Sequence, residues 1–140
     1  MDEQKKSGNP ISSLSCTKTP PAIGPYSKAT KVNLGNYSMI FCSGSIGVVK
    51  ETGELISADV GEQTKQTMEN IKNLLEENNC SMDRISKVTI FLTDMGYFKA
   101  VNDVYSTYFS KNLPARSCVA VAGLPRDSKV EIECIAFADS

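Results

Sequence analysis

Three short segments of the chain carry side chains that stand out as candidates for chemistry. The first is the run PARSC at 114–118, in which a proline places the turn and Arg116 stands at the start of a predicted strand. The second is Glu131, on the polar side of the last predicted strand. The third is the turn GPY at 24–26, which can present the phenol of Tyr26 at the edge of a cleft. Taken singly, each has an ordinary explanation as a surface or turn residue, so the three alone do not define a site.

The chain contains no histidine, and this limits the mechanisms that it can use. Histidine is the commonest general base and metal ligand, so its absence excludes a serine–histidine–aspartate or cysteine–histidine mechanism and a histidine metal site. Any catalysis relies on carboxylates, arginine, hydroxyls, thiols, backbone groups and water. Without a histidine to activate it, Cys118 is expected to be a buried thiol rather than a nucleophile. Asn102, in the middle of a predicted helix, is expected to lie at the surface or to be partly packed.

The cysteine pattern and the charge balance both narrow the class of protein. The five cysteines are odd in number and include no pair spaced by two residues, so we expect reduced thiols rather than disulfides or a zinc site. The 15 lysines and arginines nearly balance the 16 aspartates and glutamates, which gives no long-range attraction to nucleic acid or to anionic membranes. No apolar run approaches the roughly 20 residues that span a bilayer. Residues 1–15 lack an apolar signal core, so a cytoplasmic location is expected, with an organellar one left open.

The length of 140 residues fits one domain, and hydrophobic periodicity predicts its helices. Residues 1–10 are polar and unpatterned and are predicted to form a flexible tail, which leaves 11–140 as a single domain. Apolar residues recur at helical spacing over 59–77 and predict an amphipathic helix. A second predicted helix opens at Asp94, and one side of it carries Phe98, Val101, Tyr105, Tyr108 and Phe109.

The predicted strands surround these helices in an order that favours a mixed sheet. Strands are predicted at 26–32, 39–42, 85–92, 117–121 and 129–138. Strand–helix–strand units separated in this way predict an α+β fold with both helices on one face of the sheet. One copy of the chain has no further element to cover the other face, so we expect self-association through that face.

Several segments occur together in the order and spacing of one known family. Over 11–138 the chain closely resembles the reactive intermediate deaminase A (RidA) family, whose members also carry the names endoribonuclease, translation inhibitor and liver perchloric acid-soluble protein. The combination of PARS with the later EIE is the most specific part of the match. The matching segments are PAIGPYS at 21–27, SG at 43–44, TD at 93–94, VN at 101–102, Tyr105 with Phe109, PARS at 114–117 and EIE at 131–133.

The resemblance implies a fold, an assembly and a reaction. It implies a chorismate-mutase-like α+β fold and a homotrimer in which three sheets form a barrel-like core, with the helices outside and a cleft between each pair of neighbouring subunits. It implies the hydrolysis of small 2-imino or 2-enamino acids, 2-iminopropanoate and 2-iminobutanoate, to 2-oxo acids and ammonia. It implies that neither a metal nor a cofactor takes part.

The resemblance also implies roles for individual residues. Arg116 aligns with the arginine that binds the substrate carboxylate through its planar guanidinium. Glu131 aligns with the glutamate that holds or activates the attacking water. The backbone of Cys118 and backbone groups near Gly44 are expected to contact the substrate or the water. Three further residues match the substrate-binding cleft of the family: Tyr26, Ser43 and Asn102.

The chain departs from the family at positions that bear on substrate preference. SGSIG at 43–47 stands where many members have Ser-Gly-Gln-x-Pro, GY at 96–97 replaces a more polar pair, and Gly123 stands where a larger residue is common. Two other functions therefore stay open. One is a non-enzymatic trimer that binds a small carboxylate or a partner. The other is an endoribonuclease acting on single-stranded RNA, which the lack of histidine and of excess positive charge disfavours.

Overall fold

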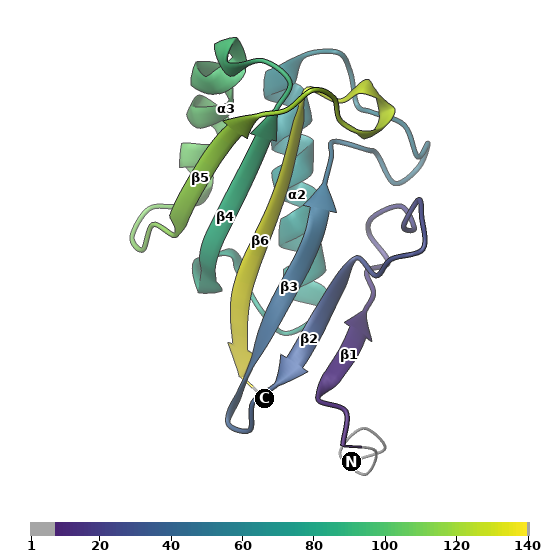
Figure 1. The fold of residues 1–140 in the computed structure, drawn as a ribbon, viewed down its shortest axis with the longest axis vertical. Coiled ribbons are helices and arrows are strands. Elements are labelled where there is room, and N and C mark those ends of the chain that lie inside the picture. Colours follow the sequence, from purple (N-terminus) through teal and green to yellow (C-terminus); the bar gives the residue numbers. More distant parts are fainter. Residues whose placement is uncertain (1–7, 140) are drawn as a thin grey trace.

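The computed structural model describes residues 8–139 and shows one mixed sheet with two helices on a single face (Figure 1). The six strands follow the order β1-β2-β3-β6-β4-β5, and all neighbours are antiparallel except the parallel pair β4 and β5. The predicted α+β fold and mixed sheet are therefore confirmed. The strands are β1 (Ile11–Leu14), β2 (Ala29–Asn33), β3 (Tyr37–Ser45), β4 (Ile85–Leu92), β5 (Ala115–Ala120) and β6 (Val130–Asp139).

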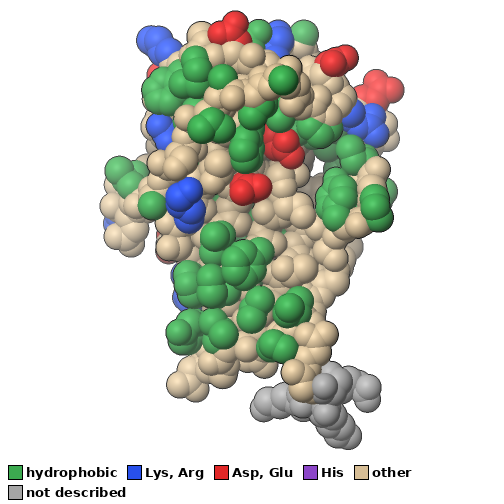
Figure 2. Space-filling view, viewed as in Figure 1, with side chains coloured by type: hydrophobic (Ala, Val, Ile, Leu, Met, Phe, Trp, Pro, Cys, Tyr) green, Lys and Arg blue, Asp and Glu red, His purple; other side chains and the backbone are tan. Residues whose placement is uncertain are grey.

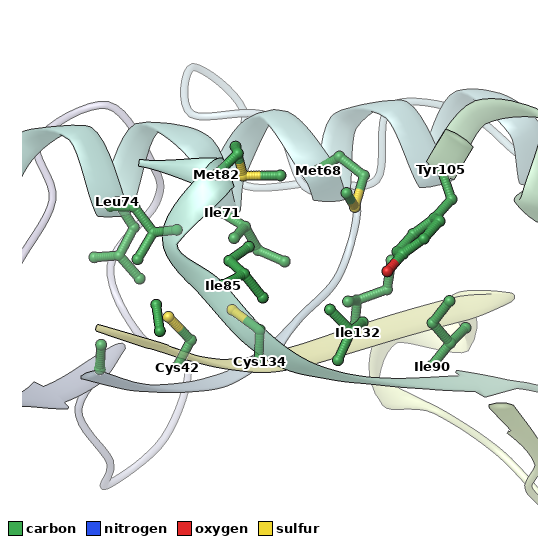
Figure 3. Packing of buried hydrophobic residues seen from close by; sticks show 14 of the residues in the cluster. Cys42, Met68, Ile71, Leu74, Met82, Ile85, Ile90, Tyr105, Ile132 and Cys134 are labelled. Atoms are coloured by element: carbon green, nitrogen blue, oxygen red, sulfur yellow. The ribbon is translucent and has the colours of Figure 1, made fainter. Parts of the chain in front are cut away.

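Two α-helices, α2 (Val60–Glu77) and α3 (Phe98–Tyr105), pack side by side behind the sheet in the view of Figure 1. Asp59 caps α2, because its side chain accepts a hydrogen bond of 2.8 Å from the backbone N–H of Glu62. The apolar side of α2 then lies on the central strands. Figure 3 shows Met68, Ile71 and Leu74 of this helix directed toward Cys42, Ile132 and Cys134 of the sheet.

Some element boundaries differ from the sequence predictions. The strand predicted at 26–32 is instead β2 at Ala29–Asn33, because the loop that contains the GPY turn continues to residue 28. The strand predicted at 117–121 begins at Ala115, which places Arg116 within it. The second helix ends at Tyr105 and continues as a 3₁₀ turn over Ser106–Tyr108. Short 3₁₀ turns also occupy Met82–Arg84, Met95–Tyr97 and Pro125–Asp127.

The first strand, β1, was not predicted from the sequence. Its four residues, ISSL, are half polar and too few to show a clear period, and they pair with β2 at the edge of the sheet. Just before β1, the carbonyl of Pro10 accepts a hydrogen bond of 2.9 Å from the N–H of Asn33. The prediction of a flexible tail over 1–10 falls largely on residues 1–7, which lie outside the described residues.

The face of the sheet opposite the helices is open in the described chain, and it is partly apolar. Side chains alternate along a strand, so the residues that flank buried Ile40 on β3 point to this open face. Tyr37 is 47% exposed and Phe41 is 39% exposed. Figure 2 shows apolar side chains gathered over the lower part of this face, with acidic side chains above them. Such a surface is typical of one that associates with another chain.

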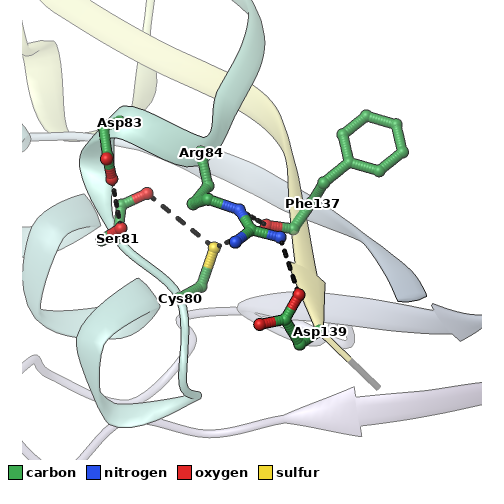
Figure 4. A network of polar contacts seen from close by, with 6 residues as sticks. All are labelled: Cys80, Ser81, Asp83, Arg84, Phe137 and Asp139. Carbon is green, nitrogen blue, oxygen red and sulfur yellow. Dashed lines mark hydrogen bonds and ion pairs between the residues drawn. The ribbon is translucent and has the colours of Figure 1, made fainter. Parts of the chain in front are cut away.

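A network of polar contacts fixes the connection between α2 and β4 to the end of β6 (Figure 4). Arg84 Nε donates a hydrogen bond of 3.2 Å to the carbonyl of Phe137, and its Nη2 pairs with Asp139 Oδ1 at 3.2 Å. The thiol of Cys80 donates to the same Phe137 carbonyl at 3.2 Å. The contacts tie the chain segment after α2 to the strand that carries Glu131, at the end remote from that residue.

The cysteines are free thiols in the structure, and three of them are buried. Cys42 on β3 and Cys134 on β6 are direct strand partners within the core. Hydrogen bonding to Cys42, together with burial, raises the pKa of Cys134, so this thiol stays protonated at neutral pH. No helix within residues 8–139 is long and apolar enough to span a bilayer.

Candidate functional site

Arg116 is held in a defined orientation by residues of α3. Its Nη1 donates a hydrogen bond of 2.6 Å to Oδ1 of Asn102. Its Cζ atom lies 4.9 Å from the ring centroid of Tyr105 and 5.5 Å from that of Phe98. Cation–π contacts of this kind contribute about 0.5–2 kcal/mol each and restrict the plane of the guanidinium. We call these four residues the arginine half-site.

The thiol of Cys118, next to the arginine half-site, is not set up to act as a nucleophile. Cys118 lies two residues further along β5 and points to the same face. Burial raises the pKa of the Cys118 thiol, while the charge of Arg116 lowers it to a smaller extent. The thiol is therefore protonated at neutral pH and is a poor nucleophile. Contact between the backbone of Cys118 and the substrate stays a prediction.

Glu131 lies close against Gly44, in the same chain. A Cβ atom added to Gly44 would collide with the carboxyl group of Glu131, so only glycine leaves room for this carboxyl. Burial raises the pKa of Glu131, and the negative charge of Glu133 raises it further. A carboxyl whose pKa is raised toward neutrality can accept and return a proton more readily than an ordinary surface glutamate.

Ser43 and Tyr26 stand beside this pair at the end of β3. Ser43 Oγ donates a hydrogen bond of 2.7 Å to the carbonyl of Ser27, and the Ser43 N–H donates to Lys28 O at 2.9 Å. Tyr26 is 48% exposed, so its phenol remains accessible. We call Tyr26, Ser43, Gly44 and Glu131 the glutamate half-site.

The glutamate half-site borders a cavity of about 220 Å³. Three of its members, Tyr26, Ser43 and Gly44, line the cavity. The cavity lies between the end of β3, helix α2 and the loop 16–28, which we call the strap. Figure 2 shows a hollow between the upper strands and the loop at the right. The other lining residues are Thr19, Pro20, Pro21, Ala22, Ile23, Lys28, Cys42, Ser45, Ile46, Val48, Gly53, Asn70, Ile71, Leu74 and Arg126.

The strap is fixed at both ends by charged side chains that sequence patterns did not single out. Lys28 Nζ donates to the carbonyls of Cys16 (3.2 Å) and Thr19 (3.1 Å) and to Oγ1 of Thr19 (2.6 Å). Burial lowers the pKa of Lys28. The Glu77 carboxylate accepts hydrogen bonds from the N–H (2.9 Å) and Oγ1 (3.0 Å) of Thr17. These partners come from distant parts of the sequence, so no local spacing could have revealed them.

The two half-sites lie on opposite faces of the sheet in one chain. Arg116 is the strand partner of Val88 on β4, whereas Glu131 is the partner of Phe91 on the same strand. Paired residues share a face, and residues an odd number apart point to opposite faces. Arg116 therefore points to the helix side and Glu131 to the open side. The structure brings the predicted site residues together in two sets, but it does not bring the sets together within one chain.

The described residues offer no evident metal site. Within 8–139, no group of three or more cysteine, aspartate or glutamate side chains is arranged to hold a metal ion. The distinctive features are instead the guanidinium of Arg116 stacked on Tyr105, the half-buried carboxyl of Glu131 packed against Gly44, and the cavity beside Gly44.

The fold and the site together define a class of small α+β domain. Its features are a mixed sheet with two helices on one face, a stacked arginine on the helix side and a carboxyl on the open side. The chain belongs to the family whose model is described as endoribonuclease L-PSP, which matches residues 16–138. Relatives in this class include the protein named reactive intermediate deaminase A, chloroplastic, of Arabidopsis thaliana, which is 42% identical over 88% of this chain and 64% of its own. The resemblance seen in the sequence is therefore confirmed.

Other members of the family are similar in sequence and in structure. The 2-iminobutanoate/2-iminopropanoate deaminase of Mus musculus is 43% identical over 123 residues, which are 88% of each chain. The solved structure of E. coli TdcF with bound serine has a TM-score of 0.80 and 41% sequence identity, and the match covers 89% of this chain and 97% of that one. Similarity over almost the whole domain means that the fold around both half-sites is shared.

Proposed function

We propose that this protein hydrolyses small 2-imino acids to 2-oxo acids and ammonia, without a metal or cofactor. The observation that carries the proposal is the pairing of an oriented guanidinium with a carboxyl of raised pKa, Arg116 and Glu131, in a family that includes curated imine deaminases. The first group suits the carboxylate of the substrate. The second suits the water that must attack its C=N carbon.

Arg116 is the group proposed to bind the substrate carboxylate. Within residues 8–139 its only hydrogen-bond partner is Asn102, which occupies one Nη atom and leaves donors for an incoming carboxylate. The rings of Phe98 and Tyr105 hold the guanidinium plane, so little side-chain freedom is lost on binding. The solved structure of E. coli TdcF contains bound serine, which also carries an α-carboxylate.

Glu131 is the proposed general base. Its carboxylate takes a proton from water as the water oxygen bonds to the imine carbon, and the proton is passed to the nitrogen. The carboxylate then takes the hydroxyl proton of the resulting carbinolamine and passes it to the amino nitrogen as the C–N bond breaks, which leaves a 2-oxo acid and releases ammonia. Backbone groups near Gly44, beside this carboxyl, are suited to hold the polar atoms of the intermediate.

The proposed site is completed between copies of the chain. Arg116 and Glu131 point to opposite faces, so one substrate can contact both only if the two residues come from neighbouring subunits. The open apolar face with Tyr37 and Phe41 offers a surface for such packing. A homotrimer with three equivalent clefts, as the family resemblance implies, meets both requirements.

The name of the family model points to a ribonuclease, but the local charge argues against that reaction. Glu131 and Glu133 lie two residues apart on the open face of β6, where they repel a phosphodiester backbone. The absence of histidine removes the usual proton donor and acceptor. The imine reaction, in contrast, needs an anion-binding guanidinium on one side of the substrate and a carboxylate on the other.

A coupled assay tests the proposed function. A threonine dehydratase supplies 2-iminobutanoate, and the protein is expected to accelerate the formation of 2-oxobutanoate. Arg116→Ala should lose about 2–5 kcal/mol of transition-state binding, which is at least about 30-fold in kcat/KM. Arg116→Lys should recover only part of this, because an ammonium lacks the planar pair of donors.

Arg84→Ala serves as the matched control, since Arg84 belongs to the network at the far end of β6. It should leave the acceleration unchanged. An acceleration that is absent in the wild type, or equal in the wild type and Arg116→Ala, would refute the proposed function.

A further inference from the structure

The cavity beside the glutamate half-site is larger than a three- or four-carbon imino acid requires. Its volume is about 220 Å³. An apolar protein cavity of roughly 150 Å³ is already large enough to bind benzene. The space beside Ser43 and Gly44 therefore exceeds the needs of a single methyl or ethyl group.

The walls of this cavity are mostly apolar and come from three separate parts of the fold. The strap contributes two prolines, Pro20 and Pro21, and the segment after β3 contributes Ile46. Helix α2 contributes Ile71 and Leu74, which belong to the hydrophobic core. Walls built from the core and from prolines are stiff, so the cavity keeps its shape without a ligand.

The buried polar groups of the cavity are already satisfied by the protein. Asn70 Nδ2 donates to the carbonyls of Ile46 (3.2 Å) and Val48 (3.0 Å), and its Oδ1 accepts a hydrogen bond from Gln66. The Lys28 ammonium has three oxygen acceptors within the strap. A ligand group that enters the cavity thus finds few free polar partners, which favours an apolar group over a polar one.

Two charged residues line the cavity, Lys28, whose ammonium is bound within the strap, and Arg126. Arg126 lines the cavity but is exposed, and the described chain gives its guanidinium no hydrogen-bond or ion-pair partner. Its backbone, with φ of 57°, and that of Asp127, with φ of 55°, are both in the left-handed region. Such strained positions persist where the surroundings hold them. An apolar interior with a cation at its entrance fits an anion that carries an apolar tail.

The cavity adjoins the candidate site at Gly44. One side of this residue faces the carboxyl of Glu131, and the residue also lines the cavity, as do Ser43 and Tyr26. Glu131 itself does not line the cavity, so a substrate side chain that starts near Glu131 must pass Gly44 to enter it.

We propose that this cavity binds the side chain of the substrate, so that the enzyme prefers 2-imino acids with a branched or aromatic apolar side chain over those with a methyl or ethyl group. The inference rests on the proposed function and adds the class of substrate to it. It follows from the volume, the apolar walls, the internally satisfied polar groups and the contact through Gly44.

A series of imino acids of increasing size tests this preference. An amino-acid oxidase, with catalase present, generates the imines of alanine, leucine, phenylalanine and glutamate, and the acceleration of 2-oxo acid formation is compared at equal imine supply. The leucine or phenylalanine imine is expected to be hydrolysed with a kcat/KM at least about tenfold above that of the alanine imine. Calorimetry gives a second readout, in which 4-methyl-2-oxopentanoate should bind at least about tenfold more tightly than pyruvate.

A cavity-filling variant separates the cavity from the rest of the site. Ala22→Phe places a ring on the strap where a small residue now lines the cavity, and it should bring the leucine-to-alanine ratio toward one. Ala58→Phe is the matched control, because Ala58 is exposed and does not line the cavity. It should leave the ratio unchanged.

The outcomes distinguish this inference from the proposed function. If no imine in the series is hydrolysed faster with the protein, the proposed function itself fails. If the alanine imine is hydrolysed as well as the larger ones, or the glutamate imine best of all, only the role of the cavity is refuted. The same conclusion holds if Ala22→Phe and Ala58→Phe give the same ratio.

Discussion

The position of the Glu131 carboxyl depends on the absence of a side chain at residue 44. Gly44 lies within a bulge of β3, between Cys42 and Ser45, where the pairing of β3 with β6 shifts register. The bulge turns the backbone so that the missing Cβ faces the carboxyl. The glycine is thus a positional requirement of the proposed base and not only a flexible link.

Replacing Gly44 by alanine should move Glu131 and reduce activity. The added Cβ collides with the carboxyl, and a displaced base of this kind can cost about 10²-fold in kcat. The free energy of unfolding should fall by about 1–3 kcal/mol through overpacking. Imine hydrolysis and urea unfolding measure the two effects.

Gly123→Ala is the matched control, because nothing lies within 4 Å of a Cβ at that glycine. It should behave like the wild type. Full activity in Gly44→Ala would show that the contact between these two residues does not position the base.

The pH dependence of the reaction should report the surroundings of Glu131. A general base works when ionised, so kcat/KM falls as the pH drops through the pKa of this carboxyl. Burial and Glu133 raise that pKa above the ordinary value of 4.5, so the acid limb of the profile should lie above pH 4.5. Glu133→Gln removes the neighbouring charge and should shift the limb to lower pH.

Glu76→Gln is the control. It changes the net charge by the same amount at an exposed position of α2, on the other side of the sheet, and it should not shift the acid limb. An equal shift in both variants would mean that the profile reports net charge rather than the neighbour of Glu131.

Most of the candidate site residues were predictable, but their arrangement was not. The segment PARS and the strand with Glu131 identified the arginine and the carboxyl, because residue type and order were sufficient for the family match. The stacking of Arg116 on Tyr105 and Phe98 depends on how α3 lies against β5, which no local pattern encodes. Lys28 and Arg126 were missed for the same reason, since their roles follow from contacts across the fold.

At the scale of elements, α2 both covers the sheet and shapes the cavity. Asn70, on the buried side of the helix, holds the irregular segment after β3 through the carbonyls of Ile46 and Val48. Val48 forms only an isolated bridge with Leu55, and within residues 8–139 the one backbone donor to the carbonyl of Ile46 is the nearby N–H of Val48, at 2.9 Å. The side chain therefore replaces backbone pairing where the strand ends.

Asn70→Ala should destabilise the fold by about 1–3 kcal/mol, because the Val48 carbonyl loses its donor and the Ile46 carbonyl keeps only that of the Val48 N–H. The free energy of unfolding in urea, at one fixed protein concentration, measures the effect. Asn73→Ala, one turn further along the same helix and half-buried, is the control, and it should cost less. Equal losses in the two variants would indicate a general helix effect instead of the tie to the segment after β3.

The long helix and the central strands were predictable because their apolar residues repeat with a clear period. The predicted 59–77 and 85–92 agree closely with α2 at Val60–Glu77 and β4 at Ile85–Leu92. The misplaced elements are those whose limits depend on other segments. Strand β1 exists only because β2 offers it an edge, and the loop before β2 is held by Lys28, so neither feature is encoded locally.

At the scale of the whole molecule, the separation of the half-sites makes a direct test of assembly possible. If each cleft takes Arg116 from one subunit and Glu131 from a neighbour, a mixture of Arg116→Ala and Glu131→Ala chains should regain activity. Random mixing at equal amounts leaves about a quarter of the clefts with both side chains intact. Each variant alone should remain inactive.

The mixture should be prepared by refolding the two variants together, with separately refolded and then combined chains as the control. Activity of about a quarter of the wild-type value only after joint refolding would support the shared cleft. No recovery would contradict the proposed assembly, in which the two residues meet between neighbouring subunits.

The two tied ends of the strap also have a use in protein engineering. Hydrogen bonds of the charged side chains of Glu77 and Lys28 hold the loop near its ends. Between these contacts, Pro20, Pro21 and Ile23 form part of the cavity wall. A library of sequences grafted into 20–23 should therefore change which molecules are accepted while the scaffold stays folded. Residues 20–23 can thus be varied while the contacts at the ends of the strap are kept, which makes the protein a starting point for catalysts that act on imines of chosen shape.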